Sequence, residues 1–202
     1  MGSEMCIRDR WRSARHRAPL TDRAAHPDAV EGVVAFTDLV GYTEYTALRG
    51  DVEALEVLSI QDRIVGATLP PDARVVKELG DGLLLYFAAA ASAIATGLVL
   101  QQRFEAAAED GVLPLWVRIG MHWGRPVSRG EDLVGHDVNV AARIVDVAAP
   151  GELLCSHATV AAAGANVDGI DFVELGPVVM KGIPEPVELY RAEPAWRPSP
   201  VG

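Results

Sequence analysis

Apolar residues recur along this chain with two different spacings, and their alternation predicts strands and helices in turn. Val33 to Leu39 is an apolar run of the length of a buried strand. The stretch from Thr43 to about Thr68 is amphipathic and ends before Pro70-Pro71, with apolar residues at helical spacing at Leu48, Val52, Leu55, Leu58 and Val65. From Val75 to Phe87, two apolar strands flank Gly80-Asp81-Gly82, which predicts a β-hairpin.

The rest of the chain continues this alternation of strands and helices. The expected elements are helices at about 88–108 and 137–148, a small helix ending at 163, strands at 115–122, 152–156, 171–180 and 186–192, and a polar connection at 125–136. No glycine pattern of a Rossmann fold or a P-loop is present. The order β-αα-ββ-α-β predicts an α+β fold with a ferredoxin-like βαββαβ core and appended C-terminal strands.

The 202 residues are enough for one domain with a full core, which we place at residues 31–193. Residues 1–10, MGSEMCIRDR, match one translated reading frame of a common sequencing-library adaptor, and we interpret them as an assembly artefact. Residues 11–30 are Arg-rich without an apolar period, and we expect a linker or the remnant of a truncated upstream region. Residues 194–202 form a Pro-rich tail.

Charge and cysteine content narrow the class of partner and the compartment. The formal net charge is -10, and residues 31–202 carry 12 basic against 24 acidic residues, which argues against nucleic-acid binding. Two cysteines, Cys6 and Cys155, without metal-ligand spacing are typical of a reducing, cytoplasmic setting. The uncharged stretch 82–102 begins with a hairpin strand and continues with small residues, so we expect no membrane span.

Two aspartates are candidate metal ligands. Asp38 lies near the end of a buried strand, before a turn into a helix at Gly41-Tyr42-Thr43, where free helix N–H groups can hold phosphate. Asp81 lies between two glycines, which let an ion and phosphate oxygens approach closely. Two carboxylates can hold two ions for phosphoryl chemistry. Each aspartate alone is equally at home as an ordinary cap or turn residue.

Polar residues on a later helix and two isolated lysines add to this set. Asn139 and Arg143 are four residues apart and share one helix face, which suits ribose orientation and stabilisation of transition-state charge, although a solvated helix face is the ordinary reading. The chain has 16 Arg but only two Lys, Lys77 and Lys181. A lysine is a compact single-point donor, so both positions are candidate ligand contacts.

Four segments together resemble the class III nucleotidyl (adenylate/guanylate) cyclase catalytic domain. These are FTDLVGYT, KELGDG, DLVGHDVNVAAR and MKGIPEPVELY, which span residues 33 to about 192 in the right order and spacing. The resemblance implies that Asp38 and Asp81, with the Leu39 carbonyl, hold two Mg²⁺ or Mn²⁺ ions. It further implies that Lys77 and Asp132 read the base, Asn139 orients the ribose, Arg143 stabilises the transition state and Lys181 contacts phosphate.

The base-reading pair implies ATP as the substrate. Lys77 only donates and an ionised Asp132 only accepts, which complements the N1 acceptor and 6-amino donor of adenine and opposes guanine. The expected reaction converts ATP to 3′,5′-cyclic AMP and pyrophosphate. In this family the metal ligands and the base-reading residues come from different subunits, so the resemblance implies a homodimer with two shared active sites.

Two rival interpretations stay open. Another two-metal nucleotidyl transferase, such as a polymerase or a diguanylate cyclase, shares the paired aspartates, but the GG-[DE]-EF turn of diguanylate cyclases is absent. A catalytically silent cyclase-like module for nucleotide sensing or dimerisation would bind nucleotide without turnover.

Overall fold

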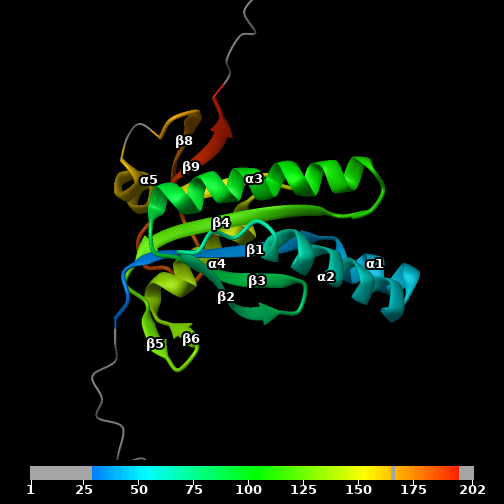
Figure 1. The fold of residues 1–202 in the computed structure, drawn as a ribbon. Helices are drawn as coiled ribbons and strands as arrows, with labels where there is room; N and C mark the ends of the chain where they lie inside the picture. The colour runs from blue at the N-terminus through cyan, green and yellow to red at the C-terminus, as the bar shows by residue number, and fades with distance from the viewer. Residues whose placement is uncertain (1–28, 165–166, 196–202) are drawn as a thin grey trace, which may run out of the picture.

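A seven-stranded sheet organises the part of the chain that the computed structural model describes, residues 29–164 and 167–195 (Figure 1). Its order is β2-β3-β1-β4-β7-β9-β8, and β5 and β6 pair in a separate ribbon. The strands are β1 (Gly32–Val40), β2 (Ala73–Leu79), β3 (Gly82–Phe87), β4 (Trp116–Gly124), β5 (Val127–Arg129), β6 (Asp132–Val134), β7 (Leu153–Ser156), β8 (Ile170–Val178) and β9 (Val187–Pro194). The helices are α1 (Tyr42–Arg49), α2 (Asp51–Gly66), α3 (Ala90–Glu109), α4 (His136–Val147) and α5 (His157–Ala163).

The first four strands of the large sheet form the predicted ferredoxin-like core. β1 pairs antiparallel with both β3 and β4, and β2 extends the sheet beyond β3. β7 then joins β4 in parallel, and β9 and β8 follow in antiparallel pairing. The α+β prediction with appended C-terminal strands is therefore confirmed.

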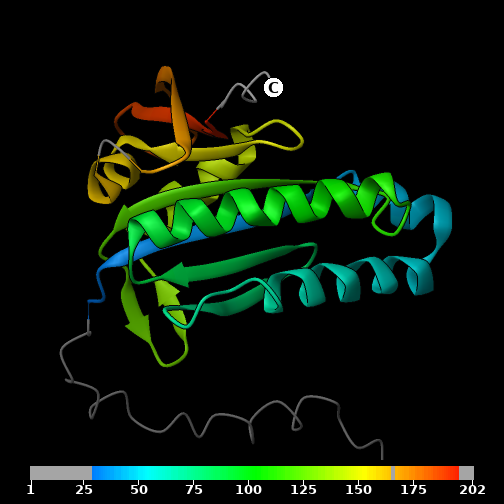
Figure 2. The same ribbon diagram turned by 45° about the horizontal axis from the view of Figure 1, so that its top comes forward.

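Helices cover both faces of the sheet. α2, α3 and α5 lie on one face, where Leu85, Ile94 and Ile119 belong to the largest buried cluster (Figures 1 and 2). α4 lies on the opposite face, where Ile144 packs with Leu154 of β7 in a second cluster. The central strand β1 is thus covered on both faces, which explains why its apolar residues form a nearly continuous run.

The structure differs from the expected elements in two places. The helical stretch expected at 43–68 divides at a position that the sequence pattern did not indicate, because Gly50 adopts φ 90° and ends α1 by bonding to the Thr46 carbonyl. Leu48 and Val52, placed on its apolar face, are 81% and 75% exposed. The connection at 125–136 contains the β5–β6 ribbon, whose pairing of short polar segments leaves little apolar pattern in the sequence.

Alternate residues of β4, from Arg118 to Gly124, form the surface against which α4 packs, and we call this surface the track. Gly120 has no room for a side chain, because a Cβ there would overlap the backbone nitrogen of Val145 in α4. Gly124 is equally restricted by the carboxyl group of Asp137 at the other end of the helix. Because strand residues two apart point to one face, Arg118 and His122 share this face with the two glycines. The segment Arg118–Gly124 therefore sets how closely α4 approaches the sheet.

Candidate active site

The two candidate metal ligands lie side by side at one end of the sheet. Asp38 is in β1 and pairs in register with Gly82, the residue after Asp81. Asp81 itself follows Gly80 in the two-residue turn between β2 and β3, and Gly80 adopts φ 71°, a conformation that suits glycine at the first turn position. Strand pairing thus brings together two carboxylates that are 43 positions apart in the sequence.

The charge around Asp81 favours a cation at this end of the sheet. Burial is the main factor that raises the pKa of the Asp81 carboxyl, and the negative charge of Asp38 raises it further. A backbone hydrogen bond and the positive charge of Arg118 act in the opposite direction on the same pKa. The charge of Asp38 thus disfavours the ionised form of Asp81, and a bound cation would offset this effect.

Arg118 is a residue of this site that the sequence reasoning missed. Its Nε donates to Oδ2 of Asp38 at 2.7 Å, and its Nη1 donates to the carbonyl of Asp146 in the last turn of α4 at 3.0 Å. The link arises because Asp38 and Arg118 are register partners across β1 and β4. That register follows from strand pairing between distant segments, so no local motif marks the arginine.

The start of α1 lies immediately after the strand that carries Asp38. Gly41 adopts φ 82° as the N-cap, and no side chain caps the helix. The first-turn N–H groups near Tyr42 and Thr43 therefore have no side-chain acceptor, and their contact with phosphate stays a prediction. The Leu39 side chain is buried in the core, where it anchors the end of β1.

Three of the predicted nucleotide-binding residues line one cavity. Lys77 of β2 and Asp132 of β6 form an ion pair, with 2.9 Å between Nζ and Oδ2. They share a cavity of about 280 Å³ with Asn139 of α4 and with the apolar side chains of Phe36 and Leu84. The hydrogen bond from Lys77 is the main factor that lowers the pKa of the Asp132 carboxyl. The carboxylate is therefore an acceptor at neutral pH.

The structure does not place all predicted residues in this cavity. Asp38 and Asp81 are absent from its lining, and so are Arg143 and Lys181. Arg143 is exposed on α4 and donates to Asp146 at 2.6 Å. Lys181 is exposed in the turn after β8, next to Met180, which packs against α4. One chain thus holds two separate groups, the carboxylates with Arg118 and the cavity with Lys77.

The donor set at Asp38 and Asp81 fits Mg²⁺ or Mn²⁺. Among residues 29–164 and 167–195, no three side chains of His, Cys, Asp or Glu are grouped as a self-contained metal centre. Mg²⁺ is commonly held by one or two carboxylates together with substrate phosphates. Two adjacent carboxylates beside free helix N–H groups match that requirement, with the remaining oxygens coming from a nucleotide.

The sequence predicts His136 and His157 to be surface residues in turns and Cys155 to be a buried small apolar residue. His136 and His157 are exposed as expected, although they begin α4 and α5 and do not lie in turns. Cys155 is buried in β7, and burial raises the pKa of its thiol to about 12, which keeps the thiol protonated and unreactive. None of the described helices combines the length and apolar character that a membrane crossing needs.

Comparison with known proteins identifies the family. The family model for the adenylate and guanylate cyclase catalytic domain matches residues 27–193. The chain belongs to the class III nucleotidyl cyclase family. The resemblance carried by the four sequence segments is therefore confirmed.

Relatives of this cyclase domain include proteins of both nucleotide specificities. The pH-sensitive adenylate cyclase MT1302 of Mycobacterium tuberculosis is 34% identical over 172 residues, which cover 82% of this chain and 41% of the relative. The fold matches the adenylyl cyclase CyaB of P. aeruginosa with a TM-score of 0.74 at 21% identity, covering 84% of this chain and 96% of that one. It also matches the guanylyl cyclase Cya2 with a TM-score of 0.67 at 24% identity, covering 86% and 97%.

Proposed function

We propose that this cyclase domain converts ATP to 3′,5′-cyclic AMP and pyrophosphate at sites shared between two copies of the chain. The observation that carries the choice of ATP is the pairing of Lys77 with Asp132 in one cavity beside Asn139. Lysine supplies a donor and the ionised aspartate supplies an acceptor, as adenine requires. Guanine presents the opposite pattern at the same edge, and both side chains would face a group of their own kind.

Asp38 and Asp81 are the residues that would hold the metal ions. Bound Mg²⁺ or Mn²⁺ would make the 3′-hydroxyl of ATP more acidic and offset negative charge on its phosphates. The two carboxylates fix that position at the end of β1, next to the uncapped start of α1, whose N–H groups face an anion favourably. The Arg118 guanidinium adds a fixed positive charge on the same side.

The separation of the two groups of residues supports a dimer. The cavity that holds Lys77 and Asp132 contains neither candidate metal ligand. A second copy that placed its carboxylates against this cavity would complete an active site, and symmetry would create a second one. In such a site Asn139 would orient the ribose, and Arg143 and Lys181 would contact the phosphates of the nucleotide.

Product analysis of the full chain tests this proposal. The chain is incubated with Mn²⁺ or Mg²⁺ and with ATP or GTP, and the products are separated by chromatography and identified by mass. We expect cyclic AMP and pyrophosphate from ATP, loss of both with EDTA, and loss in Asp81→Ala. The exposed Asp168 gives a matched control, Asp168→Ala, which should retain activity.

Each contrary outcome removes a different part of the proposal. No cyclic nucleotide from a confirmed dimer would support the silent nucleotide-sensing module. Cyclic GMP as the preferred product would overturn the proposal that Lys77 and Asp132 recognise adenine. Full activity of Asp81→Ala would overturn the metal site, and a linear product would favour another two-metal nucleotidyl transferase.

A further inference from the structure

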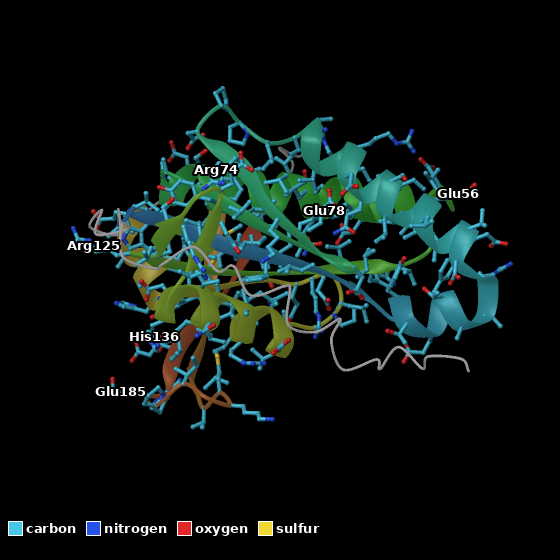
Figure 3. The ribbon with its side chains drawn as sticks, turned by 90° about the horizontal axis from the view of Figure 1, so that it is seen from below. Glu56, Arg74, Glu78, Arg125, His136 and Glu185 are labelled. Atoms are coloured by element: carbon cyan, nitrogen blue, oxygen red, sulfur yellow. The ribbon has the colours of Figure 1, made fainter. Side chains whose placement is uncertain are left out.

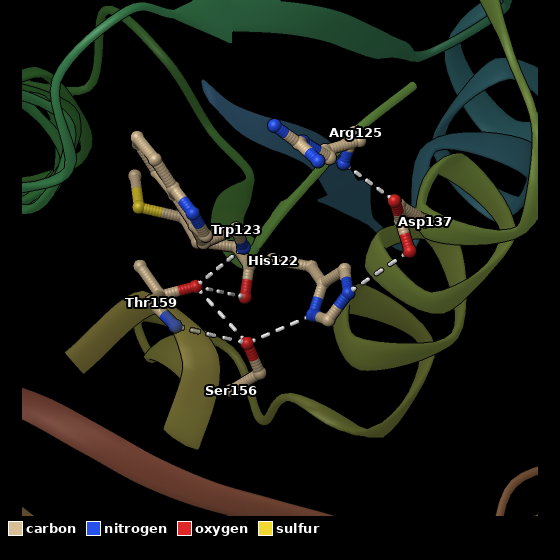
Figure 4. A network of polar contacts seen from close by, with 7 residues as sticks. His122, Trp123, Arg125, Asp137, Ser156 and Thr159 are labelled. Atoms are coloured by element: carbon tan, nitrogen blue, oxygen red, sulfur yellow. Dashed lines mark hydrogen bonds and ion pairs between the residues drawn. The ribbon is translucent and has the colours of Figure 1, made fainter. Parts of the chain in front are cut away.

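A largely buried polar network joins β4, the start of α4 and the N-cap of α5, and none of its members has a role in the proposed reaction (Figure 4). At its centre is His122, whose side chain is 14% exposed. Nδ1 of His122 lies 2.8 Å from Oγ of Ser156, and Nε2 lies 3.5 Å from Oδ1 of Asp137. A single imidazole thus contacts a residue from each of the two neighbouring helical segments.

Asp137 connects this network to the candidate active site. It lies in the first turn of α4, and its other oxygen, Oδ2, accepts from the backbone N–H of Arg125 at 2.6 Å. Both carboxylate oxygens are therefore held by the end of β4. Asn139 follows two residues later and lines the cavity with Lys77. The contact of His122 with Asp137 consequently fixes the turn of helix from which Asn139 projects.

An Asp–His–Ser arrangement also occurs in hydrolases, but Ser156 is not placed to act as a nucleophile. Ser156 is 1% exposed, and its Oγ caps α5 by accepting from the backbone N–H of Thr159 at 3.3 Å. A nucleophilic serine has to reach a substrate carbonyl. The arrangement of Ser156 therefore suits a structural partner of the imidazole.

The hydroxyl groups next to His122 can satisfy both of its protonation states. Thr159 Oγ1 accepts from the backbone N–H of Trp123 at 2.8 Å and donates to the Met121 carbonyl at 3.3 Å. The Ser156 hydroxyl proton is then free to point to Nδ1 of neutral His122 or to Thr159, 3.0 Å away. With a protonated ring, Nδ1 donates to Ser156, and no polar group is left unpaired.

Burial and the charged groups around the His122 ring determine the pH range in which the ring is protonated. Burial is the main factor that lowers the pKa of His122 from 6.5, while the negative charge of Asp137 raises it and His136 lowers it. The titratable side chains that line the adjoining 430 Å³ cavity are His136 and Asp137 of α4, His157 of α5, and Glu185 and Glu188 before and in β9. Figure 3 shows His136 and Glu185 on this side of the molecule. At neutral pH the ring is uncharged, with Nε2–H directed to Asp137.

We propose that His122 is a positioning residue for the cyclase reaction, which holds the first turn of α4 through Asp137 and shifts that turn when the ring is protonated. This inference rests on the proposed function, because the turn it controls carries Asn139. A cationic ring attracts the Asp137 carboxylate more strongly than a neutral ring does. Because that carboxylate is part of α4, the shortened contact moves the helix start relative to the cavity.

Two amide substitutions of His122 distinguish the contact with Asp137 from the contact with Ser156. In His122→Gln the side-chain amide reaches the position of Nε2 and can still donate to Asp137, whereas in His122→Asn it reaches only the position of Nδ1 next to Ser156. We expect kcat of His122→Asn to fall by about 10-fold or more with KM for ATP within about 2-fold, while His122→Gln stays near wild type at pH 7.5. His157→Asn, at an exposed histidine, is the matched control and should leave both constants unchanged.

The pH profile supplies a second readout. For the wild type we expect kcat to fall as the pH is lowered from 7.5 through the pKa of His122, which lies below 6.5. His122→Gln has no ionisable ring and should lack this decline, whereas His157→Asn should keep it. Equal loss of kcat in the Gln and Asn variants, or wild-type kcat in both, would overturn the proposal, and so would an unchanged decline in His122→Gln.

Hydrogen exchange tests positioning without reference to activity. The amide of Asn139, which donates to the Gly135 carbonyl at 3.3 Å, and the hydrogen-bonded amides of the next turn of α4 should exchange faster in His122→Asn than in wild type, by about 10-fold, and at the wild-type rate in His122→Gln. Equal exchange in the two variants would overturn the positioning role whether or not the chain makes cyclic AMP. Conversely, the expected exchange pattern in a chain without cyclase activity would retain the role of His122 at α4 and reject the proposed reaction.

Discussion

Arg118 and Asp38 face each other across neighbouring strands, and Nε of the guanidinium donates to Oδ2 of the carboxylate at 2.7 Å. Their side chains are 25% and 27% exposed, so the pair is partly shielded from water. The same guanidinium donates to carbonyl groups at the C-terminal end of α4, where a positive charge also interacts favourably with the helix dipole. One side chain therefore connects the proposed metal site to the helix that carries Asn139.

Removal of Arg118 should weaken the fold and strengthen ion binding. Arg118→Ala leaves the Asp38 carboxylate without its partner, and we expect the free energy of unfolding to fall by about 1–3 kcal/mol in urea titrations. Without nucleotide, Mn²⁺ should raise the melting temperature of this variant more than that of wild type, because the cation no longer competes with the guanidinium for Asp38. Arg129→Ala, in the β5–β6 ribbon, is the control. An equal Mn²⁺ effect in Arg118→Ala and Asp38→Asn would contradict the site.

Loss of Lys77 should affect nucleotide use selectively. Lys77→Ala removes the proposed donor for adenine N1, and we expect kcat/KM for ATP to fall by about 10- to 100-fold, with the partly exposed site limiting the effect. Arg74→Ala is a matched control on the same strand, because Arg74 is exposed and donates to the Glu131 carbonyl in the ribbon (Figure 3). Initial rates with ATP and GTP measure the change. Similar losses in both variants would mean that the strand and not the base contact is affected.

Mixing of two impaired variants tests the shared sites. Lys77→Ala and Asp81→Ala damage opposite sides of the proposed dimer, so each heterodimer keeps one intact site. Random mixing should restore about a quarter of the wild-type rate, since half of the dimers are then mixed and each has one working site. Lys77→Ala mixed with Asn139→Ala should restore nothing, because both changes affect the same side of each site. Absence of rescue in isolated Lys77/Asp81 heterodimers would argue for sites within one chain.

The contact of β4 with α4 should be intolerant of added atoms at Gly120. A Cβ there would overlap backbone atoms of Val145, so we expect Gly120→Ala to reduce the free energy of unfolding by about 1–3 kcal/mol. Gly66 ends α2 with nothing within 4 Å of a Cβ, and Gly66→Ala should be neutral or stabilising by up to about 1 kcal/mol. Chemical denaturation of both variants provides the comparison. A stable Gly120→Ala would show that α4 can move away from the sheet.

The sequence predicts those parts of the fold that depend on local pattern. β1 and the β2–β3 hairpin follow from apolar runs and a Gly-Asp-Gly turn, and strand pairing then places Asp38 and Asp81 together. The break at Gly50 was missed because Leu48 and Val52 continue the helical spacing across it. Their exposure shows that periodicity alone does not reveal which face is buried.

The ion pairs of the site depend on pairing between distant segments. Lys77 and Asp132 are 55 residues apart and were assigned together only through the family resemblance. Arg118 and His122 had no such assignment, since each acts through a partner fixed by the register of β4 or by the position of α4. The roles of Arg143 and Lys181 stay predictions, because both side chains point to solvent in a single chain.

The alternate residues of β4 that form the track and contact α4 have to be exchanged together with the helix when α4 is moved between related proteins. Arg118, Gly120, His122 and Gly124 meet α4 from its C-terminal to its N-terminal end, each by a different kind of contact. A designer who transplants α4 between cyclases to alter nucleotide preference would therefore have to transplant these four alternate strand positions with it. The three residues between them face α3 and could keep the identity they have in the recipient protein. Along this strand, residues from the donor cyclase would therefore alternate with residues of the recipient.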